Sequence, residues 1–157
     1  MKRNKRMGVT KSLGLISLIG LVLINPSLTL AQEEILLETL GATTAQGLFL
    51  THMAIGTLVD GYAAKAYDKE KAIQIMDAYI QISQSTKDGL NKLLTSHPLS
   101  DEDTRYLRRI ISTYDLLIAS AYDVKAFINT GNKTHVEAYT KDRDQAWGQI
   151  SDLLGLK

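Results

Sequence analysis

The stretch DEDTRYLRRIISTYDLLIASAYDVKAFINT, residues 101–130, decides the fold class of this chain. Its apolar residues recur at intervals of three and four, the spacing that places them on one face of an α-helix. They are Leu107, Ile110, Ile111, Tyr114, Leu117, Ile118, Ala121, Val124 and Ile128. Ser100 is a typical N-cap residue, and three acidic residues follow it at the positive end of the helix dipole. The pattern predicts one long amphipathic helix.

The residues after this helix predict a turn and a final helix. Gly131 suits the position just past a helix C-terminus. Thr134 and Glu137 fit the Thr-x-x-Glu capping box that begins a helix. We therefore expect Asn132 to be a turn residue and His135 a surface residue of the first helical turn. The seam of this last helix ends at Gly155 and contains Val136, Tyr139, Trp147, Ile150, Leu153 and Leu154.

Two more helices are predicted upstream. Residues 69–96 carry a stripe that Pro98 terminates, and residues 33–66 repeat a similar spacing. Asp68 is a plausible N-cap between them, which leaves a very short turn near Tyr67. Four amphipathic helices with short connections pack as antiparallel neighbours. The sequence thus predicts an all-α, up-down-up-down four-helix bundle with coiled-coil-like packing.

The N-terminus has the pattern of a secretory leader. MKRNKRMGVTK holds five cations and no acid, and the apolar run Leu13–Ile24 follows it. Asn25 and Pro26 interrupt the run, and we expect cleavage after Ala31. The alternative is an uncleaved anchor, which would need about 20 apolar residues. We expect residues 1–31 to be a signal peptide and residues 32–157 to be a single exported domain that does not span the membrane, in a bacterial periplasm or outside the cell.

Charge and cysteine content exclude several classes of function. The chain has 18 Lys and Arg against 17 Asp and Glu. Without the five cations of the leader, residues 32–157 have 13 against 17, a net charge of −4. Nucleic-acid binding requires a basic face, so we expect no nucleic-acid partner. The absence of cysteine excludes disulfides, thiolate metal sites and covalent c-type haem.

No pattern of residues predicts catalysis, and we expect neither an enzyme nor a cofactor. No Glu precedes a His by three positions, as the di-iron bundles require. His52 and Met53 are adjacent, so on a helix they face about 100° apart and cannot hold one metal together. A nucleophile elbow and a phosphate loop are both missing from the sequence.

One group of residues is a candidate ligand site. The seam of the last helix, extended backwards, places Arg143 between Tyr139 and Trp147 on the apolar side. Other helices contribute polar groups at similar heights, so a polar layer could hold an anionic small ligand through the guanidinium. The candidate site residues are Arg143, Trp147, Tyr139, Thr44, Thr51 and Tyr114. The alternative is that Arg143 extends outward or pairs with an acid at the edge of the bundle.

The first helix also carries an unusual number of small residues. It contains four glycines, and each costs about 1 kcal/mol relative to Ala in a helix interior. Thr43, Gly47 and Thr51 are four residues apart and share one face. Such a face allows either a close helix crossing or a groove for a ligand.

The segment Phe127-Ile128-Asn129-Thr130-Gly131-Asn132, followed by Glu137-Ala138-Tyr139, resembles the extracytoplasmic four-helix-bundle sensor domains of bacterial chemoreceptors and histidine kinases. This resemblance implies a bundle that binds a small ligand or a partner protein between its helices. We expect a non-enzymatic binding module for a small ligand or an envelope protein, which could form a homodimer. The alternatives are a structural or assembly factor that docks on a membrane complex, and an enzyme or metal carrier.

Overall fold

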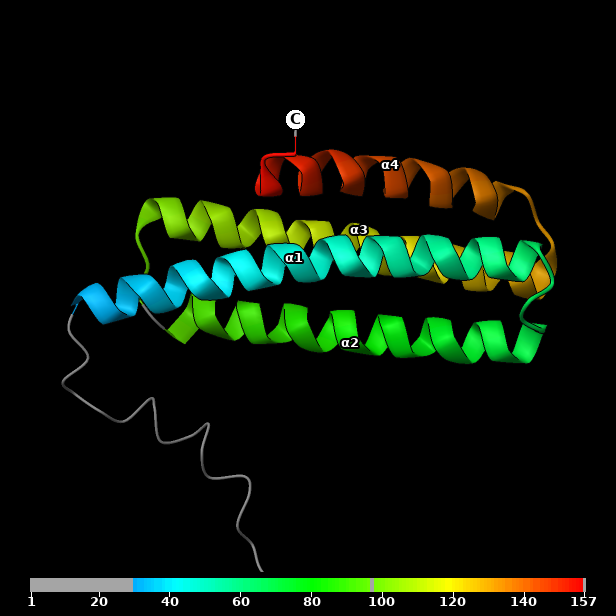
Figure 1. The fold of residues 1–157 in the computed structure, drawn as a ribbon, viewed down its shortest axis with the longest axis horizontal. Helices are drawn as coiled ribbons and strands as arrows, with labels where there is room; N and C mark the ends of the chain where they lie inside the picture. The colour runs from blue at the N-terminus through cyan, green and yellow to red at the C-terminus, as the bar shows by residue number, and fades with distance from the viewer. Residues whose placement is uncertain (1–29, 97, 157) are drawn as a thin grey trace, which may run out of the picture. The chain divides into compact units, whose positions relative to one another are not determined.

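The computed structural model describes residues 30–96 and 98–156, and within these ranges it contains four helices and no strand. The helices are α1 (Leu30–Ala63), α2 (Lys69–Ser96), α3 (Asp101–Thr130) and α4 (Thr134–Leu154) (Figure 1). Leu37–Lys157 belong to one compact unit, and the first turns of α1 belong to another. The predicted leader, residues 1–31, lies almost entirely outside the described residues, and so does His97. Among the described residues, no helix is long and apolar enough to cross a membrane.

For the part of the chain that the structure describes, the prediction of an all-α fold with four helices is confirmed. The bounds of α2 and α3 agree with the apolar stripes from which they were predicted. The end of α1 was predicted wrongly, because the helix stops at Ala63 and not at residue 66. The connection that follows, residues 64–68, is therefore longer than the turn expected near Tyr67.

Most helix ends are capped by the residues that the sequence indicates. Ser100 Oγ accepts the backbone N–H of Asp103 at 3.0 Å, and Asp68 Oδ1 accepts that of Lys71 at 2.7 Å. Gly131 and Gly155 end α3 and α4 with φ values of 70° and 63°. These positive φ values favour glycine, which has no Cβ to clash in the left-handed region.

The predicted capping box at the start of α4 is wrong. Thr134 is the first residue of the helix, and the N-cap position is taken by Lys133, whose side chain makes no capping bond. Asn132 supplies the bond instead, since its Oδ1 accepts the N–H of Thr134 at 3.1 Å. Asn132 is thus a turn residue, as predicted, with a capping role that was not predicted.

Each helix contributes at least one fully buried apolar side chain to a common core. These side chains are Leu48 from α1, Met76 from α2, Ile110 and Leu117 from α3, and Ile150 from α4. The largest contribution comes from α3, whose buried positions include Leu107, Tyr114, Ile118, Ala121, Val124 and Ile128. The stripe that predicted this helix is therefore its core face.

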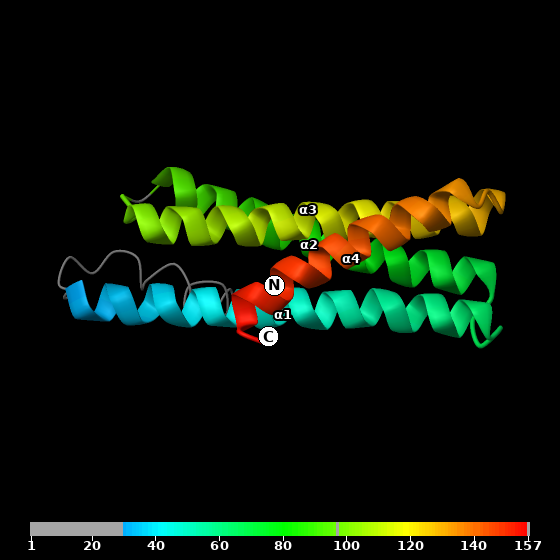
Figure 2. The same cartoon turned by 90° about the horizontal axis from the view of Figure 1, so that it is seen from above.

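Polar pairs between neighbouring helices fix their register. Lys87 on α2 pairs with Asp115 on α3 at 2.8 Å, and further along the same two helices Asp77 pairs with Lys125. Helix α4 is held to α3 by Arg109–Asp152 at 3.8 Å and His135–Asp123 at 3.0 Å. Seen from above, α4 crosses obliquely over α3 and α1 (Figure 2).

The glycines of α1 make room for large side chains of other segments. A Cβ at Gly41 would lie 2.8 Å from Tyr106 Cε1, and one at Gly47 would lie 3.2 Å from the Tyr114 hydroxyl. A Cβ at Gly56 would overlap the guanidinium of Arg143. Close packing of these side chains offsets the low helix propensity of glycine.

Candidate functional site

A pocket of about 770 Å³ opens at the end of the unit where the α1–α2 and α3–α4 connections lie. Both connections are visible at the same end of the helices in Figure 1. The volume lies within the range of about 300–1,000 Å³ that is usual for small-ligand pockets. The lining residues are Val59, Tyr62, Ala63, Lys65, Tyr67, Asp68, Lys69, Val124, Phe127, Ile128, His135, Val136 and Tyr139. The pocket is mainly apolar, with a few polar groups along its edge.

The α1–α2 connection forms one side of this pocket through an unusual backbone turn. The N–H of Ala66 donates to the carbonyl of Gly61 at 2.8 Å, and the N–H of Lys65 donates to that of Tyr62 at 3.0 Å. This is the Schellman arrangement, which requires a left-handed residue after the helix. That residue is Lys65, with a φ of 60°, and it is the only residue other than glycine with positive φ among those described.

A glycine allows the aromatic side of the pocket to form. A Cβ at Gly61 would lie 2.5 Å from Cε2 of the Tyr67 ring, so the ring packs directly against the backbone of α1. Tyr67 therefore folds back onto the last turns of α1, although it lies in the connection. Asp68 follows it and begins α2 through the capping bond to Lys71.

The opposite side of the pocket is fixed by a polar contact between α3 and α4. His135 Nδ1 lies 3.0 Å from Asp123 Oδ1, and both side chains are partly buried. The bond orients the imidazole in the first turn of α4. His135 was predicted to be a surface residue, and its pairing with Asp123 was not foreseen.

Tyr139 connects the pocket to the predicted site on α4. Its hydroxyl accepts a hydrogen bond of 2.7 Å from Arg143 Nη1, one turn along the helix. Burial raises the pKa of Tyr139, and the nearby charge of Arg143 opposes this effect. The phenol therefore keeps its proton at neutral pH, and that proton is available to an acceptor.

Trp147 lies beside a buried histidine and not in the pocket. Its ring centroid is 5.4 Å from that of His52 and 6.1 Å from that of Phe49. His52 is 5% exposed, and its Nδ1 has no hydrogen-bond partner among the described residues. Burial lowers the pKa of His52, and Arg143 lowers it further, while Asp144 acts in the opposite direction. The imidazole is therefore neutral at pH 7.

The remaining predicted site residues lie on α1, or close to it, at a distance from the pocket. Thr44 Oγ1 donates to the carbonyl of Leu40 at 2.6 Å, and Thr51 Oγ1 to that of Gly47 at 2.9 Å. The Tyr114 hydroxyl lies close to Gly47. The structure thus brings Arg143 and Tyr139 together and places Trp147 near His52, while Thr44, Thr51 and Tyr114 are grouped elsewhere. None of these residues except Tyr139 lines the pocket.

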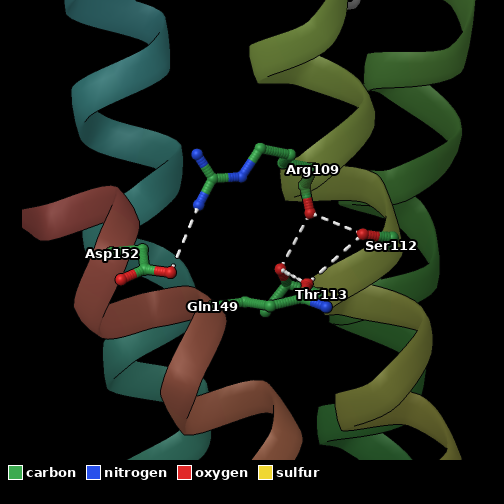
Figure 3. A network of polar contacts seen from close by, with 5 residues as sticks. All are labelled: Arg109, Ser112, Thr113, Gln149 and Asp152. Atoms are coloured by element: carbon green, nitrogen blue, oxygen red, sulfur yellow. Dashed lines mark hydrogen bonds and ion pairs between the residues drawn. The ribbon is translucent and has the colours of Figure 1, made fainter.

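A polar network between α3 and α4 was not foreseen from the sequence (Figure 3). Thr113, which is fully buried, lies 2.6 Å from Gln149 Oε1 and 2.8 Å from the carbonyl of Arg109. Ser112 makes longer contacts with the same two acceptors, at 3.3 and 2.9 Å. The network joins α4 to α3 through hydrogen bonds, so we assign it a structural role.

No protein-family model matches this chain, and no curated protein or solved structure shows significant similarity to it. Within the described residues, no group of three or more His, Asp or Glu side chains is placed to hold a metal ion. The pocket beside the α1–α2 connection is therefore the feature on which a functional argument can be based.

Proposed function

We propose that residues 37–157 form an antiparallel up-down-up-down bundle that binds a small, mainly apolar ligand in the pocket at its end, without catalytic turnover. The pairs between α2 and α3 support the topology, because residue numbers fall along α2 as they rise along α3. In the pairs between α3 and α4, residue numbers likewise fall along α4 as they rise along α3, which supports an antiparallel arrangement of these two helices. The predicted leader supports a location in a bacterial periplasm or outside the cell.

The observation that carries the proposal is the pocket itself. Its walls come from α1, α3 and α4 and are formed by Val59, Val124, Phe127, Ile128 and Val136. Apolar walls with a few convergent polar groups are typical of small-molecule sites. The resemblance of residues 127–139 to ligand-binding sensor domains supports the same interpretation.

A neutral apolar probe tests the proposal without knowledge of the natural ligand. N-phenyl-1-naphthylamine becomes strongly fluorescent when it enters an apolar site. We expect the purified protein to enhance its fluorescence in a saturable manner. Val136→Phe, which adds bulk at the pocket, should weaken binding by about tenfold, the effect of roughly 1.4 kcal/mol. Ile82→Phe is the matched control, because Ile82 is exposed on α2 and does not line the pocket.

The proposal is wrong if the folded protein gives no enhancement. It is also wrong if Val136→Phe and Ile82→Phe bind the probe equally well. The location of the chain has its own test. N-terminal sequencing of protein from the periplasm and the culture medium should find Gln32 as the first residue.

A structural role in an assembly is a second candidate function, and the outward face of α1 favours it. Exposed, uncharged residues recur there at intervals of three and four, as in a coiled-coil seam. They are Thr39, Thr43, Gln46, Leu50, Met53 and Thr57. An uncharged seam can face a second copy of itself without repulsion, so the partner we propose is a second copy of this chain.

Light scattering after size-exclusion chromatography tests this second candidate. A dimer that Leu50→Lys converts to a monomer would support it, whereas a wild-type monomer at high concentration would reject it. Leu50 is 65% exposed, so the substitution should leave the fold intact.

A further inference from the structure

The polar groups of the pocket are unevenly distributed. The apolar walls are formed by α1, α3 and α4, whereas Lys65, Asp68 and Lys69 follow one another along the α1–α2 connection and the start of α2. A ligand that fills this pocket would therefore contact apolar surface along most of its length and charged groups at one end. The lining therefore suits an amphipathic ligand, which has an apolar body and a charged end.

The charge available at that end is positive. Asp68, whose carboxylate accepts the N–H of Lys71 and begins α2, keeps its negative charge, so two ammonium groups against one carboxylate leave a net charge of +1 at this end. His135, on the other side of the pocket, is held by Asp123. Among the described residues, neither Lys65 nor Lys69 has a hydrogen-bond or ion-pair partner for its side chain. Two unpaired ammonium groups thus remain beside the apolar walls.

The backbone at Lys65 gives independent support for a role of this side chain. Its left-handed conformation is one that residues other than Gly, Asn and Asp rarely adopt. A glycine at this position would close the turn with less strain. A strained residue at the edge of a pocket is a common feature of ligand sites, where the position of the side chain matters.

We propose that the ligand is an amphipathic carboxylate whose apolar part lies against Val124, Phe127 and Val136 and whose carboxylate pairs with Lys65 and Lys69. This assignment rests on the proposed binding function of the pocket. The Tyr139 hydroxyl, which accepts from Arg143 and retains its own proton, can donate a hydrogen bond to the same ligand.

Competition against the neutral probe tests the assignment with three ligands that share a ten-carbon chain. Decanoate, decanol and decyltrimethylammonium are titrated, below their micelle concentrations and at low salt, into the protein loaded with N-phenyl-1-naphthylamine. We expect decanoate to displace the probe at the lowest concentration. In the double variant Lys65→Gln/Lys69→Gln, the advantage of decanoate over decanol should fall by about tenfold, since each exposed ion pair contributes roughly two- to fivefold.

Lys71→Gln is the matched control for a charge change in the same helical turn, because Lys71 is exposed and does not line the pocket. It should leave the preference for decanoate unchanged. Equal displacement by decanoate and decanol, a preference for the cation, or an equal effect of Lys71→Gln would overturn the assignment. If the probe itself does not bind, the proposed binding function fails as well, so the two failures are distinguishable.

Discussion

The guanidinium of Arg143 on α4 fills the space that a side chain at Gly56 on α1 would need. The apolar spacing of the last helix predicted this arginine on its apolar side, and the structure shows how a cation is accommodated there. The missing Cβ makes room for the guanidinium, and Tyr139 accepts a hydrogen bond from it. The same relationship between a glycine of α1 and a large side chain recurs at Gly41, Gly47 and Gly61.

The effect of a glycine-to-alanine substitution on stability should therefore have opposite signs in α1 and α2. Apart from the neighbouring residues and backbone of α2 itself, nothing lies within 4 Å of the position that a Cβ would occupy at Gly89, so Gly89→Ala should stabilise the protein by about 1 kcal/mol through helix propensity alone. Gly41→Ala gains the same propensity but displaces Tyr106, and overpacking costs about 1–3 kcal/mol. Denaturant unfolding followed by circular dichroism should place the two midpoints on opposite sides of the wild type. Equal shifts would contradict the packing of α1.

The start of α4 offers a second test, because sequence and structure assign its cap to different residues. Asn132→Ala should lower the free energy of unfolding by about 0.5–2 kcal/mol through loss of the bond to the N–H of Thr134. Thr134→Ala should cost less, since Thr134 is not the N-cap residue of the helix. A larger loss of stability in Thr134→Ala than in Asn132→Ala would instead support the capping box that the sequence predicted.

His52 should make the stability of the fold depend on pH. Burial, with a smaller contribution from Arg143, holds its folded-state pKa below the ordinary value of 6.5. The unfolded chain therefore takes up a proton more readily than the folded chain. The stability contributed by neutral His52 is present above pH 6.5 and is lost as the pH falls from there through the folded-state pKa.

The test is to measure the free energy of unfolding between pH 7.5 and pH 5. This range extends about 1.5 pH units to the acid side of the ordinary histidine pKa. His52→Gln should reduce the loss of stability on acidification. His135→Gln is the comparison variant, because it removes an imidazole elsewhere in the fold and leaves His52 in place. An unchanged slope in His52→Gln would show that the buried imidazole does not titrate as proposed.

Lys65→Gly should separate stability from binding. Glycine relieves the left-handed strain of about 1–2 kcal/mol, and its greater freedom in the unfolded chain returns about 0.5–1 kcal/mol. The variant should thus be more stable by up to about 1.5 kcal/mol while binding decanoate more weakly. Thermal unfolding and probe competition on one sample measure both quantities. A variant that loses stability, or that keeps full affinity for decanoate, would contradict the role given to Lys65.

The sequence predicted the four helices because each carries an apolar stripe, and for α2 and α3 the stripe also indicates the bounds. The end of α1 was missed because its left-handed residue is Lys65, and a lysine gives no signal for a Schellman turn. The pocket could not be predicted, since its lining comes from four helices and the α1–α2 connection, which meet only in the folded chain. The proximity of Tyr139 and Arg143 could be predicted because both lie on one helix, one turn apart, whereas the pairing of His135 with Asp123 depends on the register between α3 and α4.

The most direct test of the central claim locates a bound carboxylate in the pocket. Isotope-edited nuclear Overhauser spectra of the protein with ¹³C-labelled decanoate would show which methyl groups the chain contacts. We expect contacts from the decanoate chain to the methyls of Val59, Val124 and Val136, all of which line the pocket. Contacts confined to Leu50 and Met53 on the exposed face of α1, or no contacts with any methyl group, would contradict the proposal.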